Sequence, residues 1–464
     1  MLRLAAGQVE SLWDEVLPLE VRELPKDLAA IDGLLADPGL LAPFAAHWET
    51  EAKVSGRSTA AHGRPTIAMD TYVRLMVIKQ RTGWGYETLV REVSDSLHLR
   101  RFCLIAIDRR VPDESTLRKL TRRLGAETVD EITRLVIAKA QRETRFVGRA
   151  VRVDSTVIEA DIRYPSDAML ALQGTRALAR EARKLSAMVK GATARVRDRS
   201  RSVAKTVRSI SRTLGRRTGQ AKAKLIELNS KAGAQIARSA REARRLAAQA
   251  RTAARGRGAK AKLAAAAKLD QLAGRCEKVS EQIDRRARGL KISDRLVSIS
   301  DPDARPIRKG KLGKPNEFGY VAQIAEITPN TKRGARGLIL PAASQVGNPG
   351  ENALLPQTVT ELQRLGLSPK EVALDGGFTI GPTTEQLKDL DPERVFISGR
   401  QQPGSRRTQR RLQRYRTGAE GRISHLKRGY GMRRSRLKGD DGQKTWTGWG
   451  ILTYNLDTLT IRTA

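Results

Sequence analysis

The N-terminal part of the chain is patterned for helices. Apolar residues recur every three or four positions over 71–80 and again over 86–99, which is the period of an α-helix with one buried face. Breaks containing glycine or proline separate the periodic stretches at 63–65, 82–85 and 111–113. The pattern predicts an all-α N-terminal domain over residues 1–145.

A helix start with a basic face follows the last break. Asp113 has the residue type and position of a helix N-cap. The turns after it carry the cations Arg118, Lys119, Arg122 and Arg123. Short helices, glycine-containing turns and a basic last helix favour a helix-turn-helix-like DNA reader, in which these cations contact DNA. The alternative is an ordinary helical domain with solvated arginines.

Beyond residue 145 the pattern becomes that of a mixed α/β protein. Residues 146–158 form an extended, β-branched stretch that carries Asp154 and predicts a strand. After a long interruption we expect strands at 296–300, 317–327 and 337–342, a helix at 354–365, a strand at 371–374, a helix at 384–390, a strand at 394–398 and a long basic helix. Asp375 follows the strand at 371–374, and Glu420 lies on the final helix. This order predicts an α/β ribonuclease H-like core, a mixed sheet flanked by helices.

The interruption at 171–290 has a different composition from the rest of the chain. It contains 32 Lys and Arg against 8 Asp and Glu. Apolar residues spaced by seven occur at Val189, Val196, Val203 and Ile210 and at Leu269, Cys276, Ile283 and Leu290. These heptads predict two or three long antiparallel helices that form a coiled-coil insertion with a basic exterior. The alternative is a disordered polycation that folds only on DNA.

These patterns divide the chain into four predicted segments. They are a helical N-terminal DNA-binding domain at 1–145, the first part of a catalytic core at 146–170, the basic helical insertion at 171–290, and the remainder of the core with C-terminal helices at 291–464.

The charge of the chain indicates its partner. The 464 residues carry a formal net charge of +37. Binding a polyanion would relieve the self-repulsion of such a chain and release counterions, so a nucleic acid is the expected partner and a small-molecule substrate is not. No apolar stretch is long enough to span a membrane and the first twenty residues are acidic, so we expect no membrane partner and a cytoplasmic location.

Three acids in unlike settings are the candidate metal ligands. Asp154 and Asp375 lie in or after short apolar runs, whereas Glu420 lies on a polar helix. If two strands and one helix converge, these acids form a carboxylate cage for two Mg²⁺ or Mn²⁺ ions. The two cysteines and four histidines have no spacing typical of zinc sites.

Cations surround Glu420 at helical spacing. Arg416 precedes it by one turn, Lys427 follows it by two, and Arg428 is adjacent to Lys427. These side chains would grip DNA phosphates beside the acids. The alternative is a surface ion pair between Arg416 and Glu420 with a solvated lysine.

Several motifs resemble one family. Arg-x3-Glu-x6-Lys, formed by Arg416, Glu420 and Lys427, is similar to the signature around the catalytic glutamate of bacterial insertion-sequence DDE transposases. Segments that resemble the ISNCY-like group lie at 154–159, 164–167, 301–311, 317–320, 425–435 and in the closing Trp-Thr-Gly-Trp-Gly-Ile-Leu-Thr-Tyr-Asn-Leu. The family signature has a tyrosine three positions before the arginine, where this chain has Gln413, and Tyr415 lies closer to the arginine.

The resemblance implies a DNA transposase that binds the ends of an insertion sequence and catalyses metal-dependent cleavage and strand transfer. It assigns Asp154, Asp375 and Glu420 as catalytic ligands of two magnesium ions. It also implies a homodimer or larger assembly on DNA, in a bacterial cytoplasm and associated with the nucleoid. Two alternatives are a non-catalytic DNA-binding descendant of a transposase and a metal-dependent nuclease without strand transfer.

Overall fold

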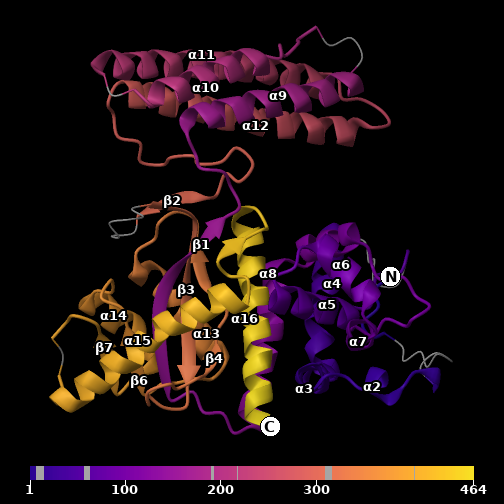
Figure 1. The fold of residues 1–464 in the computed structure, drawn as a ribbon, viewed down its shortest axis with the longest axis vertical. Helices are drawn as coiled ribbons and strands as arrows, with labels where there is room; N and C mark the ends of the chain where they lie inside the picture. Colours follow the sequence, from indigo (N-terminus) through magenta and orange to yellow (C-terminus); the bar gives the residue numbers. More distant parts are fainter. Residues whose placement is uncertain are drawn as a thin grey trace. The chain divides into compact units, whose positions relative to one another are not determined.

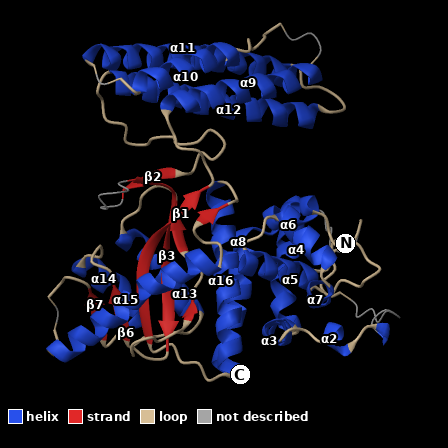
Figure 2. Ribbon diagram, in the orientation of Figure 1, coloured by secondary structure: helices blue, strands red, loops and turns tan. Residues whose placement is uncertain are grey.

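The chain folds into two compact units. The computed structural model describes residues 1–6, 15–56, 63–189, 193–216, 218–308, 316–401 and 403–463. One unit consists of residues 1–161 and 320–464, and the other of residues 162–319. Figures 1 and 2 show helices in both units and most of the strands in the first.

The N-terminal residues of the first unit are helical, as their periodicity predicts. The elements are α2 (Leu19–Arg22), α3 (Lys26–Leu35), the 3-10 helix η1 (Pro38–Leu41), α4 (Ala42–Ser55), α5 (Met69–Thr82), α6 (Tyr86–Asp95), α7 (Leu97–Phe102) and α8 (Glu114–Glu143). The side chain of Asp113 accepts a hydrogen bond from the Thr116 amide at 2.9 Å and caps α8. Gly125 interrupts α8 with a φ of 68°, a backbone conformation that favours glycine.

A mixed sheet forms the centre of the first unit, and its strand β2 and the first residues of β3 belong to the chain segment of the second unit. Its strands are β1 (Ala150–Ala160), β2 (Arg305–Arg308), β3 (Asn316–Thr328), β4 (Leu338–Ile339), β5 (Ala343–Gln345), β6 (Glu371–Leu374), β7 (Arg394–Ile397) and β8 (Arg434–Ser435). The main order is β2-β3-β1-β6-β7, with β1, β6 and β7 parallel, and β3 antiparallel to β2, β4 and β5. Nearly every residue of β1 is buried, because elements cover both faces of the sheet.

Different helices cover the two faces of β1. The remaining helices are α13 (Glu351–Arg364), α14 (Ile380–Leu387), η2 (Lys388–Leu390), α15 (Arg406–Gly429) and α16 (Gly439–Thr463). Val151 and Val153 belong to a core that includes side chains of α8, α13 and α16. Ala150, on the opposite face, packs with Leu412 and Tyr415 of α15. Because side chains alternate along a strand, Arg152 and Asp154 lie on the α15 face.

The large core of the first unit joins the N-terminal helices to the sheet. It contains Phe44 and Tyr72 from the helices, Leu374 from β6 and Trp449 from α16. The rings of Tyr72 and Trp449 meet edge to face with centroids 5.6 Å apart. The C-terminal helix α16 therefore packs against both the N-terminal helices and the sheet, and Figure 1 shows it beside α8.

The insertion is a bundle of four helices, where two or three were expected. They are α9 (Asp167–Met188), α10 (Ser200–Leu214), α11 (Gly219–Thr252) and α12 (Ala259–Ala287). The heptad through Val189 and Val196 does not mark one continuous helix, because both residues lie between α9 and α10. Side chains of α11 bind the backbone of this connection: Gln249 accepts from the Ala194 amide and Glu242 from the Arg197 amide, both at 2.9 Å.

The expected strand at 296–300 is absent from the structure, and the segment is irregular. Its backbone is bound by a side chain instead of a neighbouring strand. The Leu296 amide donates to Gln282 Oε1 at 2.5 Å, and Gln282 Nε2 donates to the Leu296 carbonyl at 3.2 Å. The other predicted elements of the C-terminal half are present, the strand at 371–374 with the predicted ends and the others with shifted ends.

Within the described residues no single helix is long and apolar enough to cross a membrane. The helices 26–35 and 38–55, bent by 71° relative to each other, pass that test only as a pair. Apolar side chains of this pair, including Ile31, Phe44 and Trp48, are buried in the core.

Candidate active site

Two of the candidate acids lie side by side on neighbouring parallel strands. β1 and β6 pair in register with Val153 opposite Leu374, so Asp154 and Asp375 are the next residues along the two strands. β6 ends at Leu374, as predicted for the strand before Asp375. β1 continues to Ala160, so Asp154 lies inside its strand.

The third acid, Glu420, is linked to Asp154 and Asp375 by Arg416, which contacts all three. The Arg416 guanidinium forms ion pairs with Glu420 at 2.8 Å and with Asp154 at 3.6 Å, and it also contacts Asp375. The guanidinium is nearly buried and so is the Asp154 carboxylate, whereas the Glu420 side chain is 60% exposed. The structure therefore brings all three predicted acids around one arginine on α15.

Close packing holds α15 over the sheet. Leu412 and Tyr415 of α15 pack on the small side chains of Ala150 and Ala373. The hydroxyl groups of Tyr415 and Thr328 hydrogen-bond at 2.7 Å. Tyr415 is thus a packing residue of the helix that carries Glu420.

A buried network of charged side chains also holds α15 against the sheet. Arg152 binds Glu326 at 2.6 Å and donates to the Tyr415 carbonyl at 3.0 Å. Glu326 also accepts from Arg422 at 3.0 Å. A Cβ on Gly418 would lie 2.0 Å from Arg152 Nη1, so glycine at this position of α15 lets the guanidinium reach the helix backbone.

The environment of Asp154 favours its protonated form. Burial is the largest cause and raises the pKa of Asp154 to about 6. The negative charge of Asp375 raises the pKa further, and the positive charge of Arg416 opposes the increase. Glu351 and Glu420 also raise this pKa, which shows that their charges act on the same site.

Glu351 is a fourth acid at the site, and the sequence patterns did not indicate it. It is the first residue of α13, and its carboxylate accepts a hydrogen bond from the Ser155 hydroxyl. A Cβ on Gly377 would lie 2.8 Å from Glu351 Cγ. The Gly-Gly pair after Asp375 is therefore the only sequence feature that reflects the approach of this acid.

The three candidate acids offer the kind of ligand atoms that hard divalent cations bind. Asp154, Asp375 and Glu420 offer only carboxylate oxygens, which magnesium and manganese prefer. In the described ranges, however, no group of three or more acidic, histidine or cysteine side chains is arranged to hold a metal ion. The three carboxylates gather around the Arg416 guanidinium instead. Metal binding at these residues would require Arg416 to give up contacts with them.

The other residues of α15 that the sequence analysis considered are placed as follows. Lys427 is half-buried and Arg428 is exposed. Gln413, at the family's tyrosine position, accepts a hydrogen bond from Ser398 at 3.2 Å, just beyond β7. His425 packs edge to face against Tyr430 with ring centroids 5.4 Å apart.

The predicted DNA-binding cations of the N-terminal domain lie in the first half of α8. Arg118 forms an ion pair with Glu114 at 2.8 Å. Lys119 and Arg122 are exposed. Arg123 packs over the ring of Trp48 at 4.0 Å. Two of these four cations are thus exposed on one helix, and two are engaged within the protein.

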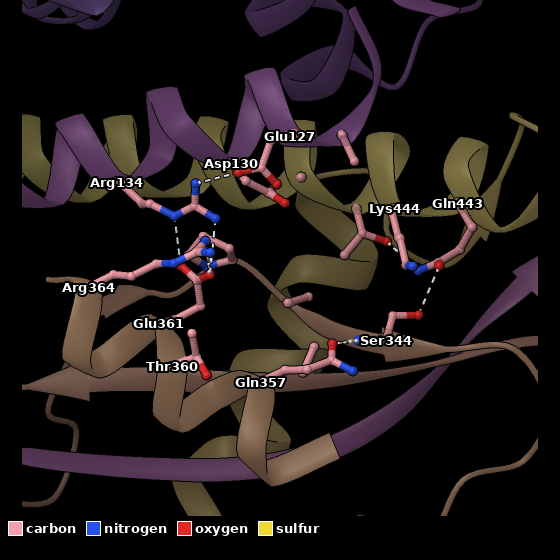
Figure 3. Close-up of a pocket in the computed structure, with 16 residues that line it drawn as sticks. Glu127, Asp130, Arg134, Ser344, Gln357, Thr360, Glu361, Arg364, Gln443 and Lys444 are labelled. Atoms are coloured by element: carbon pink, nitrogen blue, oxygen red, sulfur yellow. Dashed lines mark hydrogen bonds and ion pairs between the residues drawn. The ribbon is translucent and has the colours of Figure 1, made fainter. Parts of the chain in front are cut away.

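A separate cavity of about 300 Å³ lies between α8, α13, α16 and β5 (Figure 3). Arg134 extends into it and binds Glu131 at 2.6 Å, Glu361 at 2.8 Å and Glu127 at 3.0 Å. None of the acids around Arg416 lines this cavity, so it is distinct from the candidate active site.

Asp130 in this cavity should make stability depend on pH. Burial raises the pKa of its carboxyl group to about 8, with Arg134 opposing the increase. The unfolded chain loses this proton near pH 4 and the folded chain near pH 8, so the folded state loses stability as pH rises between these values. Asp130→Asn removes this penalty and should gain at most about 1.4 kcal/mol relative to wild type per pH unit in that window.

Urea unfolding between pH 4.5 and pH 8.5 measures the effect. Glu127→Gln is the matched control, because Glu127 lies in the same cavity and is mostly exposed. It should follow the wild type across the range. Parallel stability curves for Asp130→Asn and wild type would contradict the assignment of a buried, protonated Asp130.

One comparison with known proteins gives a match. Residues 31–123 match the family model described as a transposase domain (DUF772). The matched residues run from α3 into α8 and include none of the acids around Arg416. No curated protein and no solved structure matches the chain. The match to residues 31–123 supports a transposase-related protein.

Proposed function

We propose that this protein is a DNA transposase of the DDE type, with Asp154, Asp375 and Glu420 as its catalytic acids. The observation that carries the proposal is the convergence of these acids from two adjacent parallel strands and one helix on a single arginine. The transposase-domain match in another part of the chain supports the same class of function.

The proposal includes a ligand-bound state with divalent metal. Two magnesium or manganese ions held by the three carboxylates would activate a water or a 3′-hydroxyl and stabilise the leaving oxygen. The chain's own residues set the geometry: strand pairing fixes Asp154 beside Asp375, and the buried Arg152–Glu326 pair fixes the helix that presents Glu420. Arg416, Lys427 and Arg428 supply positive charge for DNA phosphates beside the acids.

The proposed fold of the core is ribonuclease H-like. The supporting observations are the strand β3 next to β1, the parallel strands β1, β6 and β7, and the helix α15 over that sheet. The proposed role of the N-terminal helices is recognition of the ends of the element, with the exposed Lys119 and Arg122 on α8 as DNA contacts. We further propose a homodimer or larger assembly on DNA, because two ends must be joined, and a cytoplasmic location near the nucleoid.

Incubation of the purified chain with duplex DNA from both flanks of its coding region tests the proposal. With Mg²⁺ and a target plasmid, we expect nicks at the element ends and products in which the freed 3′ ends are joined to plasmid DNA. Cleavage without joined products would identify a nuclease. Binding without cleavage would identify a non-catalytic DNA-binding descendant. A chain that neither binds nor cleaves this DNA would overturn the proposal.

A further inference from the structure

We infer that the four-helix insertion carries a binding surface for the backbone of double-stranded DNA, on the outer face of α10 and α11. The inference rests on the proposed function, from which it takes DNA as the ligand. It goes beyond that function by assigning a surface to a part of the chain that contains none of the candidate catalytic acids. The surface consists of two rows of cations, one on each helix.

The first row follows the solvent side of α10. Its members recur every three or four residues and are all exposed: Arg201, Lys205, Arg208 and Arg212. The buried residues of α10, Val203, Thr206 and Ile210, lie on the opposite side of the helix. α10 contains no acidic residue. The row therefore faces away from the bundle core without a carboxylate on its own helix.

The second row follows the solvent side of α11, with steps of seven, three and four residues. Its members are the exposed residues Lys231, Arg238, Arg241 and Arg245. The two acids of α11 are already bound by other cations: Glu227 by Lys224 at 2.8 Å and Glu242 by Arg199 at 2.6 Å. Throughout the described part of the chain, no carboxylate forms an ion pair with any of the eight cations of the two rows.

The two rows lie on neighbouring helices. Gln235, within the α11 row, donates a hydrogen bond to Ser202, next to the first cation of the α10 row, at 2.7 Å. Arg199 at the start of α10 also binds Glu242 of α11. Figure 1 shows α10 and α11 as neighbours in the bundle. The eight cations thus form one continuous basic face, which we call the α10–α11 face.

The chemistry of the α10–α11 face favours duplex DNA over other polyanions. At 1.5 Å per residue the α10 row spans about 17 Å and the α11 row about 21 Å, which correspond to about five and about six base pairs of duplex. α10 and α11 contain no aromatic residue, whereas single-stranded nucleic acids are held largely by stacking on aromatic rings. Apart from Leu214 and Ile226, which are exposed, the large apolar side chains of both helices pack in the bundle, so neither helix presents a continuous apolar face to a membrane surface.

A salt titration of DNA binding tests the inference on the full chain. The probe is a fluorescent 40-base-pair duplex of arbitrary sequence, which lacks element ends, and the measurement is anisotropy. The test variant carries Lys205→Gln, Arg208→Gln, Arg238→Gln and Arg241→Gln. Each lost phosphate contact lowers the slope of log affinity against log salt by about one. We expect the slope to fall by up to about four and the affinity at 0.1 M salt to fall at least about tenfold.

The control variant removes the same charge from the same bundle, at exposed cations that are paired with carboxylates. It carries Arg180→Gln, Arg183→Gln, Lys224→Gln and Arg288→Gln, whose partners are Glu181, Asp198, Glu227 and Asp284. We expect it to keep nearly the wild-type slope. Circular dichroism and thermal melting of both variants confirm that the bundle is folded.

Each outcome bears on one of the two proposals. Equal losses in both variants, or none in either, would overturn the assignment of the α10–α11 face and leave the proposed function standing if end cleavage persists. Tighter wild-type binding to single-stranded RNA or to phosphatidylglycerol vesicles than to the duplex would also overturn it. A wild-type chain that binds no DNA at all would overturn the proposed function together with this inference.

Discussion

Replacing Asp154 by asparagine is expected to abolish Mg²⁺-dependent cleavage at the element ends and to leave DNA binding intact. The substitution keeps the size of the side chain but removes the anionic oxygen that faces Asp375 across the two strands. Loss of one group that stabilises charge at an active site costs about 10²–10³-fold in rate, and loss of a metal ligand should cost at least as much, because it weakens the binding of the ions that supply the chemistry. Asp375→Asn and Glu420→Gln should have the same effect.

Asp161→Asn is the matched control for these variants. Asp161 follows β1 directly, is exposed and lies 3.8 Å from Arg434, so its charge is close in sequence but belongs to the surface. It should cleave like the wild type. Binding to end-containing DNA in EDTA separates lost chemistry from lost recognition. If Asp154→Asn, Asp375→Asn or Glu420→Gln cleaves DNA as well as the Asp161→Asn control, the acid replaced in that variant is not a metal ligand.

Protein stability provides an independent readout for Asp154. Burial disfavours the charged form of its carboxyl group, so Asp154→Asn should not lower the melting temperature at pH 8. A catalytic acid whose burial disfavours its charged form can be replaced without loss of stability, because its environment favours the chemistry of the site and not the stability of the fold. An acid that served only to anchor Arg416 would instead destabilise the fold when it is replaced.

The sequence predicted the strands around the site better than the contacts between them. The strand predicted at 371–374 matches β6 residue for residue, because the apolar residues 372–374 are followed directly by the polar Asp375. β1 extends past Asp154 because Thr156, Val157 and Ile158 are β-branched. The last two residues of the strand, Glu159 and Ala160, pair with β8. Which strand would lie beside β1 depended on long-range pairing, which local patterns do not encode.

Contacts made by single charged side chains were the least predictable part of the site. Arg416 was expected to bind DNA, yet it lies between three acids, and its spacing from Glu420 fitted either arrangement. Glu351 lay outside the predicted helix at 354–365, and nothing local shows that α13 begins earlier, beside Ser155. In the insertion, heptad spacing could not reveal the break before α10, which depends on side chains contributed by α11.

Glu326→Ala is expected to cause the largest loss of stability among single substitutions near the site. Glu326 is almost fully buried and binds Arg152 at 2.6 Å, Arg422 at 3.0 Å and the Gly337 amide at 2.9 Å. Its removal leaves two guanidinium groups and one amide without their acceptor in a dry environment. Breaking a buried pair from one side costs about 3–5 kcal/mol, and urea unfolding at pH 7.5 measures this loss.

The control for this substitution is Glu393→Ala, which removes the same side chain from an exposed pair with Lys370 at 2.6 Å. Solvent screens that pair, so the unfolding midpoint should hardly move. Because Arg152 also holds the backbone of α15 at Tyr415, Glu326→Ala should reduce end cleavage even under conditions where the protein remains folded. A variant with unchanged stability would show that Arg152 and Arg422 find other acceptors or reach water, and that α15 is held by its apolar contacts with Ala150 and Ala373 alone.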